Sequence, residues 1–186
     1  MKKMGFTLAE VLITLSIIGV VAALTLPTLS NNAHAQANAA KLSSTVSALE
    51  NAFGIILTAD PTDPVELHDI SYANGENFYS KIADHLKTLG TEVPTVTYSV
   101  TVPSDTVFMT KSGAIVYIED NHTAADTDAN GNVDNYYGNL YIDVNGEAKP
   151  NVLGKDLFSF HLGEDGILYP MDDETKNLVK NGYKVK

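Results

Sequence analysis

Apolar side chains dominate residues 6–26, and a single carboxylate, Glu10, lies among them. A transmembrane helix needs roughly 20 apolar residues, so this segment is long enough to span a bilayer. A charged side chain in hydrocarbon costs at least roughly 2.5–3.5 kcal/mol, which makes an acid in such a segment a functional group by default. The pattern therefore predicts a membrane-spanning helix in which Glu10 has a specific partner.

A second hydrophobic pattern follows Pro27 and the polar residues 30–32. Its apolar side chains are spaced four, three, four and three residues apart, which is typical of one face of a helix. We expect one helix over residues 6–57, bent near Pro27, with an apolar first half and an amphipathic second half that docks onto a head domain. Asp60 and Pro61 end it, because proline disfavours helix at the residue before it. The apolar stripe consists of Leu42, Val46, Leu49, Phe53 and Ile56.

A second, shorter helix is predicted over residues 76–89 and should cover the sheet. Its apolar positions again recur at helical spacing, and Gly90 follows as a C-terminal cap. The apolar positions are Phe78, Ile82, Leu86 and Leu89.

The rest of the chain predicts β-structure. Residues 96–102 alternate between apolar and polar side chains, as a half-buried strand does. Turn residues at 111–113 and 165–166 predict two hairpins, and residues 140–144 predict another strand. The fold class is therefore α+β, with a long N-terminal α-helix packed against an antiparallel sheet of about four strands and one short extra helix.

The charged residues of the chain limit the classes of partner that we expect. The formal net charge is −11, and all twelve basic residues are lysine. Binding to a phosphate backbone needs a clustered basic surface, so nucleic acid is not an expected partner. The chain has no cysteine, so an exported head would lack a disulfide.

Catalytic motifs are absent from the sequence. The five histidines show no H-E-x-x-H spacing, and there is neither a G-x-S-x-G segment nor a P-loop. The acids at residues 172–174 are typical of a solvated surface. We expect no enzymatic activity and no required cofactor.

A partner for Glu10 is available close by. Cleavage between Gly5 and Phe6 would give Phe6 an α-amino group with a pKa of about 7.7–8.0, mostly protonated at neutral pH. Glu10 lies one helical turn away, so it can pair with its own Phe6 amine or with that of a neighbouring subunit. Thr7 can add a hydroxyl contact. We expect this pair to set the register between helices in an apolar bundle.

These first residues resemble the N-termini of type IV pilins and type II secretion pseudopilins. The resemblance covers about residues 1–30 and implies cleavage after Gly5 by a prepilin peptidase, N-methylation of Phe6 and assembly into a helical filament. Gly19 and Pro27 fall where the family has its helix-loosening glycine and proline. The residues that carry the resemblance are Lys2, Lys3, Gly5, Phe6, Thr7, Leu8 and Glu10, followed by the hydrophobic run.

Two alternatives remain open at this point. Residues 33–35 read Ala-His-Ala, so an ordinary signal peptide could be cleaved after Ala35 to release a soluble domain. An uncleaved anchor would instead leave a membrane-tethered acidic module. The uncleaved anchor leaves Glu10 unexplained. The run of apolar residues is longer than an ordinary signal peptide needs, and it contains an acid.

An acidic loop is the candidate metal site. Residues 126–134 match the first nine positions of an EF-hand-like loop, with oxygen ligands at alternate positions and Gly131 at the sixth. The twelfth position is Tyr137 instead of a bidentate Glu, so we expect either a loop-type Ca²⁺ site or a solvated turn. The candidate ligands are Asp126, Asp128, Asn130, Asn132 and Asp134, and Glu119, Asp120 or Asp143 could complete the shell.

A second segment resembles the C-terminal signature of many prepilin-type proteins. It runs from Asp143 to Phe158, and its Asn145-Gly146 pair predicts a tight turn at the end of a strand. Asp156 is either a metal ligand or an acceptor that fixes the loop.

Taken together, the sequence predicts a structural subunit of a type IV pilus or a type II secretion pseudopilus. Its partners would be a prepilin peptidase, identical or related pilin subunits and an inner-membrane assembly platform. It would cross the inner membrane once, with its head outside the cytoplasm, and then enter a filament. The alternative is an exported or membrane-tethered calcium-binding module. The expected divisions are a leader at 1–5, an assembly segment at 6–29, an amphipathic segment at 30–58 and a head domain at 59–186.

Overall fold

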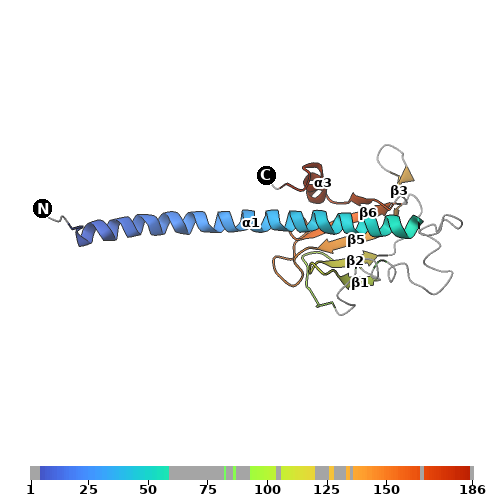
Figure 1. Ribbon diagram of the computed structural model, residues 1–186, viewed down its shortest axis with the longest axis horizontal. Helices are drawn as coiled ribbons and strands as arrows, with labels where there is room; N and C mark the ends of the chain where they lie inside the picture. The colour runs from blue at the N-terminus through green and yellow to red at the C-terminus, as the bar shows by residue number, and fades with distance from the viewer. Residues whose placement is uncertain are drawn as a thin grey trace.

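The computed structural model describes residues 5–58, 82, 86, 93–103, 106–119, 126–127, 133–134, 136–163 and 166–184. One helix dominates it. Helix α1 (Leu8–Thr58) has 51 residues, which corresponds to roughly 76 Å at 1.5 Å per residue. Its C-terminal half lies along the head, and its N-terminal half projects away from it (Figure 1). The helix predicted over residues 6–57 is therefore confirmed to within two residues at its start.

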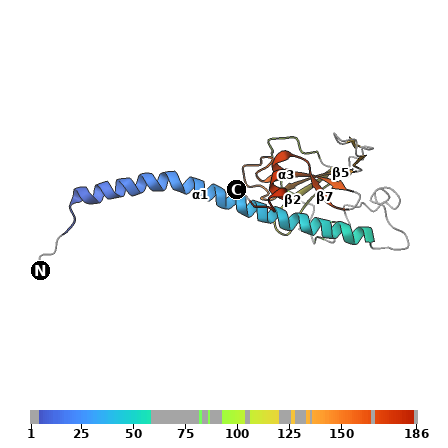
Figure 2. The ribbon, with the colours of Figure 1, turned by 90° about the horizontal axis from the view of Figure 1, so that it is seen from above.

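The helix is continuous through Pro27. Figure 2 shows that α1 is not straight, since its N-terminal stretch and the stretch along the head run in different directions. The sequence predicted a bend near Pro27. A proline removes one backbone donor from a helix, and a curved helix accommodates the lost hydrogen bond without ending.

The head contains a five-stranded antiparallel sheet in the order β1-β2-β5-β6-β7. Both predicted hairpins are present: Thr110 and Gly113 close the turn between β1 and β2, and Gly166 closes the turn between β6 and β7. A separate two-stranded ribbon pairs β3 with β4. The strands are β1 (Thr106–Met109), β2 (Ile115–Glu119), β3 (Asp126–Thr127), β4 (Val133–Asp134), β5 (Tyr136–Asp143), β6 (Leu157–Gly163) and β7 (Leu168–Pro170).

One face of this sheet packs against α1. Alternate residues of the central strands point the same way, as the register of Val116 with Ile142 and of Ile142 with Phe158 illustrates. The predicted stripe of α1 is buried against them, with every member 4% exposed or less. Together they form one core, whose strand residues are Phe108, Val116, Ile118, Leu140, Ile142, Phe158, Phe160, Leu162 and Leu168.

A C-terminal helix, α3 (Asp173–Lys180), was not predicted. Its N-cap is Asp172, whose side chain accepts a hydrogen bond from the backbone of Thr175. Asp173 and Glu174 are exposed in the first turn, where acids favour the helix dipole. The acidic run is therefore a helix start, and only part of it is the solvated surface that the sequence suggested.

The strand predicted at residues 96–102 and the helix predicted at residues 76–89 have different outcomes. Residues 96–102 are not a strand, since the described segment 93–103 forms no ladder. It is attached to the head by the hydrogen bond from Ser99 N to Asn151 O (3.1 Å). Most of the predicted helix 76–89 lies outside the described residues, but Ile82 and Leu86 are helical and pack against the core.

Candidate functional site

The start of α1 is built around Thr7 and Glu10. Because Leu8 is the first helical residue, Thr7 is the N-cap and Glu10 is the third residue of the helix. Glu10 Oε2 accepts hydrogen bonds from Thr7 N (2.7 Å) and from Thr7 Oγ1 (2.9 Å), and Glu10 N donates to Thr7 Oγ1 (3.3 Å). This reciprocal pattern is a capping box, which satisfies backbone donors that the first turn leaves without partners.

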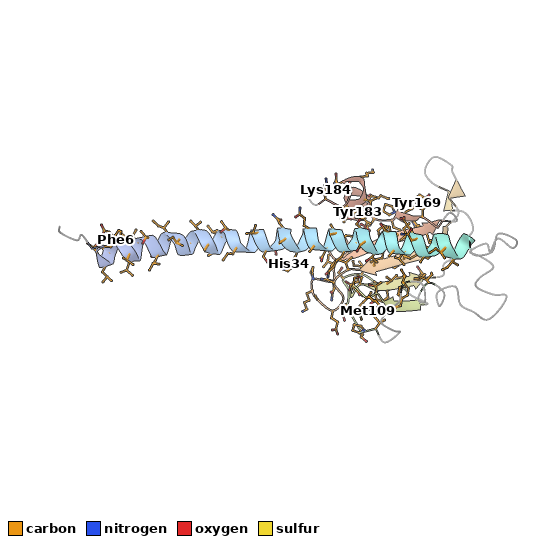
Figure 3. The ribbon with its side chains drawn as sticks, viewed as in Figure 1. Phe6, His34, Met109, Tyr169, Tyr183 and Lys184 are labelled. Carbon is orange, nitrogen blue, oxygen red and sulfur yellow. The ribbon has the colours of Figure 1, made fainter. Side chains whose placement is uncertain are left out.

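The capping box places a carboxylate next to Phe6. Thr7 N is the first backbone amide after Phe6, so Glu10 Oε2 lies within one residue of the Phe6 nitrogen. Both bonds to the carboxylate use Oε2, so within the described part of the chain Oε1 is available to another donor. Phe6 is 89% exposed and lies at the start of the helix (Figure 3). The arrangement can therefore accept a cation that approaches the start of the helix.

The apolar half of α1 is exposed to an unusual extent. Its best 18-residue window has a mean hydropathy of 2.3, and none of that window is buried within the chain. In length and composition the helix is sufficient to cross a bilayer. The exposed large side chains of this half are Leu8, Val11, Leu12, Ile13, Leu15, Ile17, Ile18, Val20, Val21, Leu24 and Leu26, and Phe6 before the helix is also exposed.

Polar side chains in this half hydrogen-bond to the helix itself. Thr14 Oγ1 donates to Val11 O (2.9 Å), Ser16 Oγ to Leu12 O (2.8 Å) and Thr25 Oγ1 to Val21 O (2.9 Å). A hydroxyl that bonds to its own helix needs no water, so these residues suit an apolar environment. At Gly19, an added Cβ would meet nothing within 4 Å, so its surroundings in the single chain are open.

Comparison with known proteins identifies this same segment. A family model described as the prokaryotic N-terminal methylation motif matches residues 1–26. The chain carries the signature of type IV pilins and pseudopilins. Over this segment the chain resembles the precursors of pilins and pseudopilins, and such a motif implies processing by a prepilin peptidase and assembly with related subunits. No curated protein and no solved structure matches the chain significantly.

The structure describes only some of the candidate calcium residues. Asp126 pairs with Asp134 across the β3–β4 ribbon, so the first and ninth positions of the loop lie opposite each other. Asp128, Asn130 and Asn132 lie outside the described residues. Glu119 accepts a hydrogen bond from Asn139 Nδ2 (2.9 Å), and Asp120 is also outside the described residues.

Asp143 forms part of a buried polar centre. Its Oδ1 atom accepts hydrogen bonds from Asn145 N (3.0 Å) and Gly146 N (2.9 Å), which confirms the tight turn at the end of β5. Its Oδ2 atom accepts from the Tyr98 hydroxyl (2.7 Å). Burial raises the pKa of Asp143 and outweighs these hydrogen bonds, which lower it.

Asp156 accepts the hydrogen bonds that fix the loop between β5 and β6. Its Oδ2 atom accepts from Asn151 N (2.7 Å) and Asn145 Nδ2 (3.1 Å), and its Oδ1 atom accepts from Val152 N (2.7 Å). Every described donor around it belongs to the loop, which fits the loop-fixing role, one of the two that the sequence allowed. The loop is thereby held in one shape between β5 and β6.

Proposed function

We propose that this chain is a structural subunit of a type IV pilus or a type II secretion pseudopilus. The main support is that the methylation motif coincides with an exposed apolar half-helix that begins at the Thr7–Glu10 capping box. An apolar surface of this size is unstable in water, so it requires either lipid or other helices around it. A subunit that moves from the inner membrane into a filament meets both requirements in turn.

In the proposed mechanism, a prepilin peptidase cleaves after Gly5 and the new amine of Phe6 is methylated. The amine is a cation at neutral pH. Glu10 is held at the start of α1 by Thr7, so the pair can form only where a Phe6 amine approaches that point. In a bundle of apolar helices an unpaired carboxylate is strongly unfavourable, and this penalty selects the register in which Glu10 meets an amine.

The remaining parts of the proposal follow from this assembly. An inner-membrane platform would extract the subunit, and the head would lie outside the cytoplasm. The chain itself would bind no nucleic acid and catalyse no reaction. The absence of cysteine and the acidic head favour a pseudopilin-like subunit, as does the proposed calcium loop at residues 126–134.

Variants of Glu10 test the proposal, because charge and capping can be separated. Glu10→Gln keeps the capping box, in which Gln substitutes for Glu, but removes the charge. Thr7→Ala keeps the charge and removes the reciprocal cap, at a cost of about 0.5–2 kcal/mol to the helix start. We expect Glu10→Gln and Glu10→Ala to insert and to be processed, and both to assemble poorly.

The measurement is the yield of filaments sheared from cells that express the full chain with its assembly machinery. Thr7→Ala should assemble better than either Glu10 variant. Normal filament yield from Glu10→Gln would show that capping alone accounts for Glu10, and the charge pairing would then be wrong.

A further inference from the structure

A groove separates α1 from the C-terminal part of the head. Its volume is about 840 Å³, within the range of ligand-binding pockets. One wall is the segment of α1 from Asn31 to Asn38, and the other walls are the loop before β6 and helix α3 with the residues that follow it. Asn38 Nδ2 donates to Lys155 O (3.3 Å), which ties the loop wall to the helix.

The charge of this groove is opposite to that of the chain. Three lysines line it, Lys149, Lys155 and Lys184, and Glu174 is the one acidic residue among its described lining. The chain as a whole has 12 basic and 23 acidic residues. The α1 wall contributes amide side chains and His34, and no acid. All three lysines are exposed, so their ammonium groups can reach an anion in the groove.

The walls are fixed before any ligand binds. Asp156 holds the loop that carries Lys149 and Lys155 through three hydrogen bonds. At Gly154, where φ is +80°, a Cβ would lie 2.6 Å from the Cβ of Glu174, so the loop packs closely on α3. These contacts reduce the backbone entropy that would be lost when a ligand binds.

The position of the groove along α1 matches the polar layer of a membrane. The apolar residues from Leu8 to Leu26 rise roughly 28 Å, close to the hydrocarbon thickness of about 30 Å. Asn31 lies five residues further, roughly 7.5 Å beyond Leu26. The headgroup layer is about 5–7 Å thick on each side, so the Asn31 end of the groove lies at the outer edge of the headgroups of the head-side leaflet. Figure 3 shows His34 and Lys184 at the end of the head that faces Phe6.

We propose that this groove binds the phosphate-bearing headgroup of an anionic phospholipid in the head-side leaflet. The inference rests on the proposed function, since it requires α1 to be inserted in a membrane. A chain of net charge −11 is repelled by an anionic surface, and a basic groove at its membrane-facing end offsets this repulsion locally. Each lysine near such a surface favours binding roughly fivefold. The bound headgroup would hold the head at the membrane before assembly.

The test uses the full chain in vesicles of phosphatidylcholine, alone or mixed with phosphatidylglycerol. Lysine acylation, read by mass spectrometry, reports access to each lysine. We expect phosphatidylglycerol to slow acylation of Lys149, Lys155 and Lys184 several-fold. Three other exposed lysines that do not line the groove, Lys41, Lys111 and Lys176, are internal controls and should change little.

A matched pair of triple variants completes the test. Lys149→Gln/Lys155→Gln/Lys184→Gln and Lys41→Gln/Lys111→Gln/Lys176→Gln remove the same charge. Native mass spectrometry from mixed micelles should find phosphatidylglycerol retained by the wild type and by the second variant, and lost several-fold from the first. Equal retention by both variants would overturn the proposal.

Other outcomes also decide against the groove. Equal protection of the control lysines would indicate general surface attraction. Protection by inorganic phosphate in phosphatidylcholine vesicles would indicate a free-anion site, and protection that depends on protein concentration would indicate a second copy of the chain. Flotation of the protein with the vesicles separates this inference from the proposed function. A protein that fails to float contradicts membrane insertion. A protein that floats normally, but whose groove lysines are not protected from acylation, contradicts only this inference.

Discussion

The hydroxyl group of Tyr98 donates a hydrogen bond of 2.7 Å to the Oδ2 atom of Asp143, a residue with no exposed surface. The same hydroxyl lies 2.9 Å from that of Tyr117, and the two rings meet edge to face with their centroids 5.6 Å apart. Tyr98 thus connects the segment before the sheet to two of its central strands. A buried carboxylate that loses a donor is costly, so this contact should contribute strongly to the stability of the head.

Replacement of Tyr98 by Phe should destabilise the head by about 1–3 kcal/mol at neutral pH. The pKa of Asp143 is already raised by burial, and without the Tyr98 donor it should rise further. A carboxyl group whose folded pKa is raised favours folding most when it is protonated, and that contribution is lost as pH rises through the folded pKa. The loss caused by Tyr98→Phe should therefore be larger at pH 7 than near pH 4.

Thermal unfolding of the full chain in detergent, followed by tyrosine circular dichroism, measures this effect. Tyr117→Phe is the matched control, because it leaves Asp143 with its Tyr98 donor. A smaller loss for Tyr98→Phe than for Tyr117→Phe would contradict the assigned role.

Removal of the carboxylate of Asp172 should weaken α3. Burial alone would raise the pKa of Asp172, but hydrogen bonds from Ser159 and Thr175 lower it below its ordinary value. The stabilisation is therefore present above the unfolded pKa and is lost as pH falls through the folded pKa. Asp172→Ala should cost about 1–2 kcal/mol at neutral pH and less in acid.

The acid dependence of unfolding in Asp172→Asn separates two contributions. Asn remains a good N-cap, so the loss should be smaller than for Ala, but the pH-dependent part should disappear. Asp173→Asn, in the first turn of the same helix, should change stability by less than about 1 kcal/mol and lose this effect in high salt. If Asp172→Asn kept the full acid dependence of the wild type, another group would have to cause it.

Two glycines should respond to alanine in opposite directions. Gly154 has φ +80° and an added Cβ would lie 2.6 Å from Glu174 Cβ, so Gly154→Ala should destabilise the head by about 1–3 kcal/mol. Gly54 lies inside α1 with nothing within 4 Å of the added Cβ, so Gly54→Ala should stabilise it by about 0.5–1 kcal/mol. Melting temperatures of the two variants should move apart. A shift of the same sign in both would be inconsistent with this geometry.

The calcium hypothesis for residues 126–134 predicts weak binding, with a dissociation constant on the order of 10⁻⁴–10⁻³ M. Pairing of Asp126 with Asp134 brings the ends of the loop together, which suits a loop-type site. Isothermal calorimetry of the full chain should detect heat with Ca²⁺, and Asp126→Asn with Asp128→Asn should abolish it. The absence of both heat and thermal shift at millimolar Ca²⁺ would remove the hypothesis.

The sequence predicted the elements that follow from long periodic patterns. The stripe from Leu42 to Ile56 is buried as expected, because five apolar positions at helical spacing define which face of the helix must pack against the core. The two hairpins are also present, since glycine in their turns permits positive φ, as at Gly113 and Gly166.

Short or tertiary features were not predictable to the same degree. Residues 96–102 alternate between apolar and polar side chains as a strand does. In the structure, however, the Tyr98 hydroxyl donates to the buried Asp143 and the Ser99 amide donates to Asn151, so this segment is held by tertiary hydrogen bonds instead of by pairing with another strand. Helix α3 has a recognisable start, with Asp172 as N-cap and two acids in the first turn, and that signal was present in the sequence. The basic groove had no signal, because its lysines come from separate segments of an acidic chain.

The identity of the first residue of the natural polypeptide tests the central claim most directly. Mass spectrometry of the chain purified from the cells that make it should find N-methylated Phe6 at the N-terminus, next to the Thr7–Glu10 capping box. A chain that begins at Gln36 would indicate an ordinary signal peptide cleaved after Ala35, and an intact Met1 would indicate an uncleaved anchor. Either result would leave Glu10 without its proposed cation and would contradict the assembly mechanism.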